Sequence, residues 1–152
     1  MRIRITLATA VSCLAVAAVV PSVASAHGTH LKAKMSGDQV VPSGSGAPNG
    51  TGVAKLHVLK DKNRLCYDVK WDSIGNSQGL NIGVYKGAEG KNGSEVVPLT
   101  TQKHPSPVDG CVDGVSTGDL KAIAKNPHLY HVNIKNKKYP TDGAIRGQLK
   151  AV

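Results

Sequence analysis

Two histidines near the start of the sequence could form part of a metal site. If a leader is removed after Ala26, His27 becomes the first residue and His30 lies three positions later. A free amine beside an imidazole is a chelating pair that favours copper or nickel, but a complete site needs a further imidazole from the fold. The remaining histidines are His57, His104, His128 and His131. The alternative interpretation is a frayed chain end that carries histidines by coincidence.

Two cysteines, Cys66 and Cys111, remain once the leader is removed, because Cys13 lies within it. Thiols are usually oxidised outside the cytoplasm, so we predict a structural disulfide between them. The alternative is a redox pair or a thiolate metal site. The sequence has no C-x-x-C motif and no third cysteine beyond the leader, and this favours the disulfide.

Three lysines, Lys135, Lys137 and Lys138, cluster just before the last predicted strand. Other basic residues lie on the earlier strands and at their ends: Lys32, Lys34, Lys55, Lys60, Lys62 and Arg64. The whole sequence carries a formal net charge of +9. This excess favours contact with an anionic cell-envelope polymer, an acidic glycan or anionic lipid heads. The alternative is that the lysines only keep the protein soluble and protect edge strands from pairing.

The sequence contains no arrangement of residues typical of an enzyme. No serine lies in a G-x-S-x-G context, the acidic residues are scattered, and no glycine-rich stretch has the strand-to-helix setting of a phosphate-binding loop. Nucleic acid is a poor candidate partner, because secretion separates the protein from it and aromatic residues make up only 3% of the chain. We therefore predict a non-enzymatic binding module.

The first 26 residues show the features of a secretory signal peptide. Two arginines precede an apolar stretch from Ile5 to Val20, and the small residues at 23–26 supply an A-x-A cleavage site. About sixteen apolar residues fall short of the roughly 20 that a membrane anchor needs. Lipidation at Cys13 is disfavoured because the apolar stretch continues beyond it. We expect a secreted domain of residues 27–152, with a formal charge of +7 and no transmembrane segment.

Alternating side chains predict strands through most of this domain. In the clearest case, Arg64 to Asp72, an apolar row that includes Leu65 and Val69 occupies one face and Cys66 lies on the other. Similar rows occur at Leu31–Met35, Ala54–Val58, Leu80–Val84, Val96–Leu99, Tyr130–Ile134 and Ile145–Leu149. Turns are expected at Asn49-Gly50, Asn92-Gly93, Asp109-Gly110, Asp113-Gly114 and Asp142-Gly143. About seven short strands favour an all-β antiparallel sandwich or small barrel.

One short connecting helix is also predicted. Thr117 is expected to cap a turn that begins near Asp119, and Asn126-Pro127 ends the helix. Because Asp109-Gly110 and Asp113-Gly114 indicate turns, Cys111 is expected in a loop that the disulfide ties to the outer face of the Cys66 strand.

Several short motifs occur in a fixed order along the chain. They are Met35–Pro42, Gly52–Ala54, Leu65–Val69, Lys86–Gly93, Gly110–Val112, Asn126-Pro127, Tyr130–Ile134 and the closing stretch Tyr139–Leu149. Together they resemble the CHRD domain, named after chordin, in its stand-alone secreted bacterial form, over roughly residues 31–149. The ending Y-P-x-x-G-x-I-R-G-Q-L is the most specific part. The resemblance implies an immunoglobulin-like β-barrel and an extracellular interaction module, since chordin binds growth-factor ligands.

The resemblance also implies a set of histidines that this sequence lacks. Typical members carry a His-Ile-His triplet before the K-G-x-x-G segment and another histidine after the Y-x-V-N-V strand. Here these places hold Gly83-Val84-Tyr85 and Lys135. We therefore transfer no metal role to these positions.

Two polar residues of the closing strands are expected to be structural. Arg146, within I-R-G-Q-L, is expected to bond loop carbonyls or to pair with a carboxylate such as Asp68 or Asp72. His131, on a predicted strand, is expected to be a hydrogen-bonded strand residue, although metal ligation is the alternative.

Overall fold

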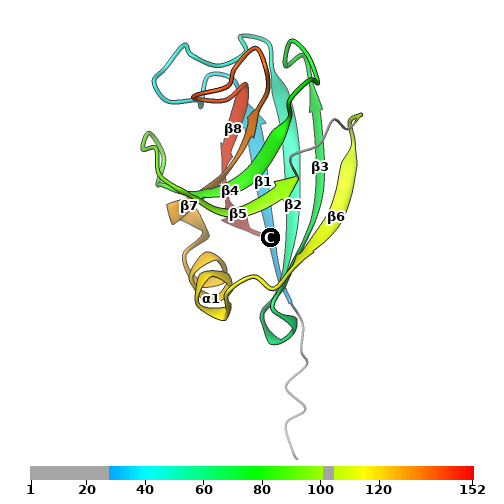
Figure 1. Ribbon diagram of the computed structural model, residues 1–152. Helices are drawn as coiled ribbons and strands as arrows, with labels where there is room; N and C mark the ends of the chain where they lie inside the picture. The colour runs from blue at the N-terminus through cyan, green and yellow to red at the C-terminus, as the bar shows by residue number, and fades with distance from the viewer. Residues whose placement is uncertain (1–27, 101–104) are drawn as a thin grey trace, which may run out of the picture.

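The computed structural model describes residues 28–100 and 105–152. Within these residues, nine strands form one antiparallel sheet in the order β5-β4-β7-β8-β1-β2-β3-β6, with β9 added beside β1. The sheet curls until its two edge strands, β5 and β6, contact each other, which makes a nearly closed barrel (Figure 1). The predicted all-β antiparallel barrel with one short helix is confirmed.

The strand bounds agree closely with the apolar rows of the sequence. The strands are β1 (Thr29–Ser36), β2 (Thr51–Leu59), β3 (Arg64–Asp72), β4 (Asn81–Lys86), β5 (Glu95–Thr100), β6 (Val108–Asp113), β7 (Tyr130–Lys135), β8 (Ile145–Gln148) and β9 (Lys150–Ala151). The helices are α1 (Thr117–Lys125) and two single 3-10 turns, η1 (Lys60–Lys62) and η2 (Pro127–Leu129). None of the described helices is long and apolar enough to cross a membrane.

Alternation along β1 and β2 explains how the core forms. Leu31 and Ala33 of β1 are each 1% exposed and pair across the sheet with Leu56 and Ala54 of β2. Successive side chains of a strand point to opposite faces, so the residues between them face outward. The inward rows of all the long strands meet in one apolar core, and this burial stabilises the barrel.

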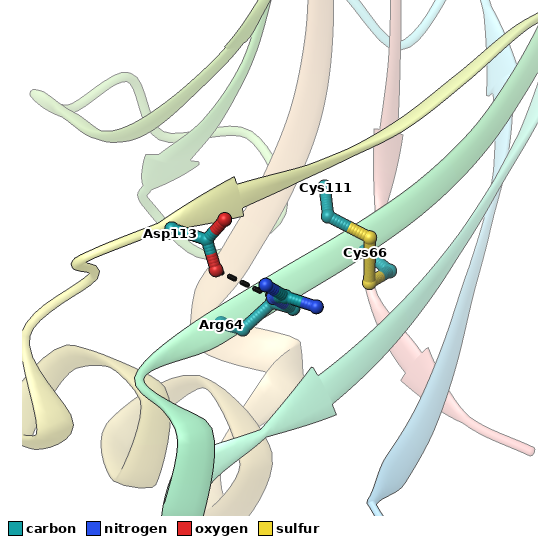
Figure 2. Close-up of a disulfide and its surroundings, with 4 residues drawn as sticks. All are labelled: Arg64, Cys66, Cys111 and Asp113. Atoms are coloured by element: carbon teal, nitrogen blue, oxygen red, sulfur yellow. Dashed lines mark hydrogen bonds and ion pairs between the residues drawn. A yellow bond between two sulfur atoms is a disulfide. The ribbon is translucent and has the colours of Figure 1, made fainter.

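The prediction that Cys111 lies in a loop is wrong. Cys111 lies in β6, directly opposite Cys66 of β3, and the two sulfur atoms are bonded (Figure 2). Gly110 is a strand residue of β6 that pairs with Tyr67 of β3, so Asp109-Gly110 is not a turn. A Cβ atom at position 110 would lie 2.8 Å from the Tyr67 hydroxyl, and this explains why the position holds glycine. The predicted disulfide itself is confirmed.

The predicted helix is present, but its cap differs. Ser116 is the N-cap, and its side chain accepts a hydrogen bond from the backbone amide of Asp119. Thr117 instead donates its hydroxyl to Asn63 Oδ1 at 2.7 Å. The helix ends at Lys125, as Asn126-Pro127 predicts, and its buried side chains, Leu120 and Ile123, cover the end of the barrel beside η1.

The disulfide is expected to stabilise the fold measurably. It closes a loop of 45 positions, so the double variant Cys66→Ser/Cys111→Ser should lose about 3–4 kcal/mol of unfolding free energy through the added chain entropy of its unfolded state. Urea denaturation of the oxidised protein and the variant measures this loss. The wild-type protein treated with reductant is the control, and its denaturation midpoint should approach that of the variant. Equal midpoints in all three samples would contradict the expectation.

Candidate binding groove

The guanidinium group of Arg146 organises the closing end of the chain. Arg146 lies on β8 and is only 2% exposed. Its Nη2 atom donates to the carbonyl oxygens of Ala88 at 2.9 Å and Lys91 at 2.8 Å, and its Nη1 atom donates to Asn92 Oδ1 at 3.1 Å. All three acceptors belong to the loop between β4 and β5. The predicted bonding of loop carbonyls is therefore confirmed, and the alternative pairing with Asp68 or Asp72 is not what the structure shows.

Gln148, two residues after Arg146, fastens the start of the same loop. Its side-chain amide donates to the carbonyl oxygens of Gly87, His128 and Tyr130, at distances from 2.7 to 3.0 Å. Arg146 and Gln148, two residues apart on β8, thus hold the β4–β5 loop against the outer side of the barrel. Residues 88 and 89 of the loop become a wall beside β9.

His131 lies under this loop as a hydrogen-bonded strand residue. It is 2% exposed, its Nδ1 atom lies 3.1 Å from the Gly87 carbonyl oxygen, and its ring stacks on Tyr85 with centroids 5.7 Å apart. Burial lowers its pKa to about 4; the hydrogen bond to Gly87 opposes this shift, and the charges of Arg146 and Lys135 add to it. The imidazole is therefore neutral at pH 7 and shielded from any ligand.

The positions where the resemblance implies histidines, 83–85 and 135, have a different polar arrangement here. A Cβ atom at Gly83 would come within 2.2 Å of Glu95 Oε1, so the glutamate side chain occupies the space beside this glycine. The Lys135 ammonium lies 5.2 Å from the Tyr85 ring centroid. Burial first, and then the charge and hydrogen bond of Glu95, raise the pKa of Tyr85. Val84 points the other way, into the core.

A groove with a volume of about 740 Å³ lies between β1, β9 and the wall formed by the β4–β5 loop. Its charged and polar lining residues are Lys32, Lys34, Gln39, Glu89, His128, Gln148 and Lys150. A smaller hollow of about 440 Å³ adjoins it and shares Gln39, Glu89 and Gln148. Arg146 lines the smaller hollow.

Three lysines make the groove positive. Lys32 of β1 pairs across the sheet with Lys150 of β9, and Lys34 follows on the same outer face of β1. The ion pairs found among the described residues are Lys55–Asp68 and Arg64–Asp113, so neither neutralises these lysines. Of the acidic side chains, Glu89 lines both the groove and the smaller hollow, and Asp38 lines the smaller hollow. The arrangement suits an anionic ligand, because like charges placed side by side favour a counter-charge between them.

The structure places the lysines predicted from the sequence elsewhere. Lys135 contacts the Tyr85 ring, and the Lys138 ammonium lies 5.4 Å from the Tyr139 ring centroid. Lys137 is exposed in the turn after β7, where its backbone amide donates to the Gln78 carbonyl. None of the three lines the groove. The alternation of Lys32 and Lys34 along one strand is a sequence signal that places both lysines on one face. The position of Lys150 beside them depends on the pairing of β9 with β1, which the sequence does not show.

The histidines near the start of the chain are partly described. His30 lies on β1 and stacks face to face with His57 of β2, with ring centroids 4.1 Å apart. His27 and His104 lie outside the described residues. Of the histidines that the sequence offered as a partner for His30, the structure therefore brings His57 beside it. No group of three or more metal-binding side chains occurs within residues 28–100 and 105–152.

Replacing Arg146 tests the network beneath the groove. Arg146→Met should lower the unfolding free energy by roughly 3 kcal/mol, because it removes three partly buried hydrogen bonds from a charged donor to the β4–β5 loop. Arg146→Lys should lose less, since one ammonium can still reach one of these acceptors. Urea denaturation measures both changes. The exposed Lys150→Met is the control, expected within about 0.5 kcal/mol of wild type. A midpoint for Arg146→Met equal to that of the control would be inconsistent with this role.

The burial of His131 should make stability depend on pH. The unfolded chain protonates this imidazole near its ordinary pKa of 6.5, while the folded state keeps it neutral down to about pH 4. The unfolded state therefore binds more protons in this window, so the stabilisation present above pH 6.5 is lost as the pH falls towards 4. We expect wild type to lose about 2–3 kcal/mol more than His131→Gln between pH 7 and pH 4. Parallel curves of unfolding free energy against pH would refute this.

One protein family accounts for the domain as a whole. The family model of the CHRD domain matches residues 31–149, which include every strand except the first two residues of β1 and all of β9. No curated protein and no solved structure matches the chain. CHRD domains are extracellular and in general of a binding, non-catalytic type. The match spans most of the chain and includes the two stretches joined by Arg146, the β4–β5 loop and the closing I-R-G-Q-L motif. The chain therefore belongs to the CHRD domain family.

Proposed function

We propose that this protein is a secreted, non-enzymatic binding module whose groove takes up an anionic glycan. The observation that carries the proposal is the group of lysines 32, 34 and 150, which line one groove and have no ion-pair partner among the described residues. Two residues of a strand advance by about 6.6 Å, and neighbouring strands lie about 4.8 Å apart. Several ammonium groups therefore face one short stretch of ligand, which suits a polymer with repeated carboxylate or sulfate groups.

The surroundings of the groove support a binding function. The groove is built on strands and on a loop held by partly buried hydrogen bonds, so little ordering is needed when a ligand binds. The disulfide between Cys66 and Cys111 fits an oxidising compartment outside the cytoplasm. The signal peptide predicted at residues 1–26 lies outside the described residues and remains a prediction. A polymer of the cell envelope is a ligand that a secreted protein would meet.

Two other predictions from the sequence remain open. A binding surface at Lys135, Lys137 and Lys138 is a competing location for the same anionic ligand. Copper binding through the amine of His27 and the imidazole of His30 is a separate function. The experiment below distinguishes the two lysine sets.

Two charge-matched triple variants test the proposal. Lys32→Glu/Lys34→Glu/Lys150→Glu should weaken binding to heparin and polygalacturonate about tenfold or more in low-salt buffer, because it reverses the charge of the groove. Lys135→Glu/Lys137→Glu/Lys138→Glu changes the net charge by the same amount and should leave most of the affinity. Affinity chromatography and titration calorimetry measure the difference, with neutral dextran as the uncharged control.

The possible outcomes separate the alternatives. Equal weakening by both triple variants would mean that net charge alone causes retention. Weakening by the second variant only would place the ligand at the turn after β7. Failure of the wild-type protein to bind either polyanion would overturn the glycan proposal and favour a protein partner.

A further inference from the structure

The smaller hollow beside the groove differs in its chemistry from the lysines. It is lined by the segment 38–43, by the β4–β5 loop and by β8, and its volume of about 440 Å³ falls within the range typical of small-ligand sites. Its acidic lining residues, Asp38 and Glu89, are both exposed. Neither carboxylate accepts a hydrogen bond or forms an ion pair with another described residue. Because a carboxylate only accepts hydrogen bonds, the hollow offers unused acceptors.

Two side-chain amides that line both the groove and the hollow add further acceptors. Gln39 Nε2 donates to the Lys34 carbonyl oxygen at 3.1 Å and to Ser36 Oγ at 2.8 Å. Gln148 Nε2 is held by the three backbone carbonyls described above. These bonds use the NH2 group of each amide, and within the described part of the chain neither Oε1 atom has a hydrogen-bond partner. Both carbonyl oxygens are therefore available to a donor on a ligand.

The charge of Arg146 determines which kind of donor suits these acceptors. Its guanidinium group lines the hollow, is 2% exposed and forms no ion pair among residues 28–100 and 105–152. This positive charge partly offsets the charges of Asp38 and Glu89, so the hollow attracts a cation less than two isolated carboxylates do. A neutral donor meets no such opposition. Sugar hydroxyl groups are neutral donors, and their hydrogen bonds to an ionised acceptor are among the stronger ones.

We infer that the ligand is a glycan in which charged and neutral sugars alternate, and that the smaller hollow binds the neutral sugar through its hydroxyl groups. The inference rests on the proposed binding of an anionic glycan in the groove and adds the class of its repeat. The groove lysines contact the charged sugar, and Gln39 and Gln148, which line both hollows, lie between the two sugars. A polymer charged on successive sugars places an anionic group beside Asp38 and Glu89, where like charges repel.

Hyaluronan oligosaccharides, which carry a carboxylate on every second sugar, are the probe for this inference. Asp38→Ala/Glu89→Ala should weaken their binding about tenfold, because it removes both carboxylate acceptors. The same variant should bind heparin and polygalacturonate as tightly as wild type or more tightly, because it removes negative charge beside the lysines. Titration calorimetry in a buffer with a chelator measures both effects without metal ions that could bridge carboxylates.

A second double variant is the matched control. Asp61→Ala/Asp109→Ala removes two exposed acids that line neither hollow, so it changes the net charge by the same amount. It should leave hyaluronan binding within about twofold of wild type, because charges far from the ligand are screened. Unfolding midpoints of both double variants should confirm that they remain folded.

The outcomes separate this inference from the proposed function. Hyaluronan binding by Asp38→Ala/Glu89→Ala that equals or exceeds wild type, or that falls no further than in the control variant, would overturn the inference alone. A wild-type protein that binds heparin through lysines 32, 34 and 150 but does not bind hyaluronan would do the same. Binding to none of the three polymers would overturn the proposed function as well. Hyaluronan freed of its acetyl groups exposes ammonium groups, and its tighter binding would assign the hollow to an amino sugar instead of a neutral one.

Discussion

The structure depends on how the buried charge of Arg146 is satisfied. Moving a guanidinium group out of water is costly unless hydrogen bonds replace its hydration. The β4–β5 loop supplies the acceptors, and to do so it must bend tightly: Gly87 has a φ of 150°, and a Cβ atom at Gly93 would lie 1.7 Å from the Lys86 carbonyl oxygen. The stretch Lys86–Gly93 and the closing I-R-G-Q-L motif, far apart in sequence, are therefore two halves of one interaction.

This interaction also determines which half of the barrel is open to ligands. All of Tyr130–Ile134 is buried, although a half-buried strand should alternate. On its outer side the β4–β5 loop covers His131, and the segment at Asp142–Gly143 covers Asn133. The outer sides of β1, β2 and β9 receive no such cover. Their polar residues, among them Lys34 and Lys150, remain exposed. The covered half contributes rigidity, and the open half carries the surfaces proposed for binding.

The sequence predicted those parts of the molecule that depend on local patterns. Alternation located the β1 and β3 core rows, and the remaining cysteine pair predicted the disulfide. The errors arose where a distant contact overrode a local signal: Gly110 looked like a turn residue until its approach to Tyr67 was known. In the same way, Thr117 could have capped α1, but Asn63 holds its hydroxyl and Ser116 takes that place. The groove needed the pairing of Lys32 with Lys150, which only the barrel topology reveals.

The three lysines of the groove come from the two ends of the domain, and their spacing has a physical consequence. Lys32 and Lys34 lie one two-residue step apart on the outer face of β1, about 6.6 Å along the strand, and Lys150 of β9 pairs with Lys32. These separations are within the screening length of about 8 Å at physiological salt, so the three charges act together on an anionic polymer. Because β9 joins the sheet by pairing with β1, loss of that pairing would remove one of the three charges from the groove and weaken the attraction.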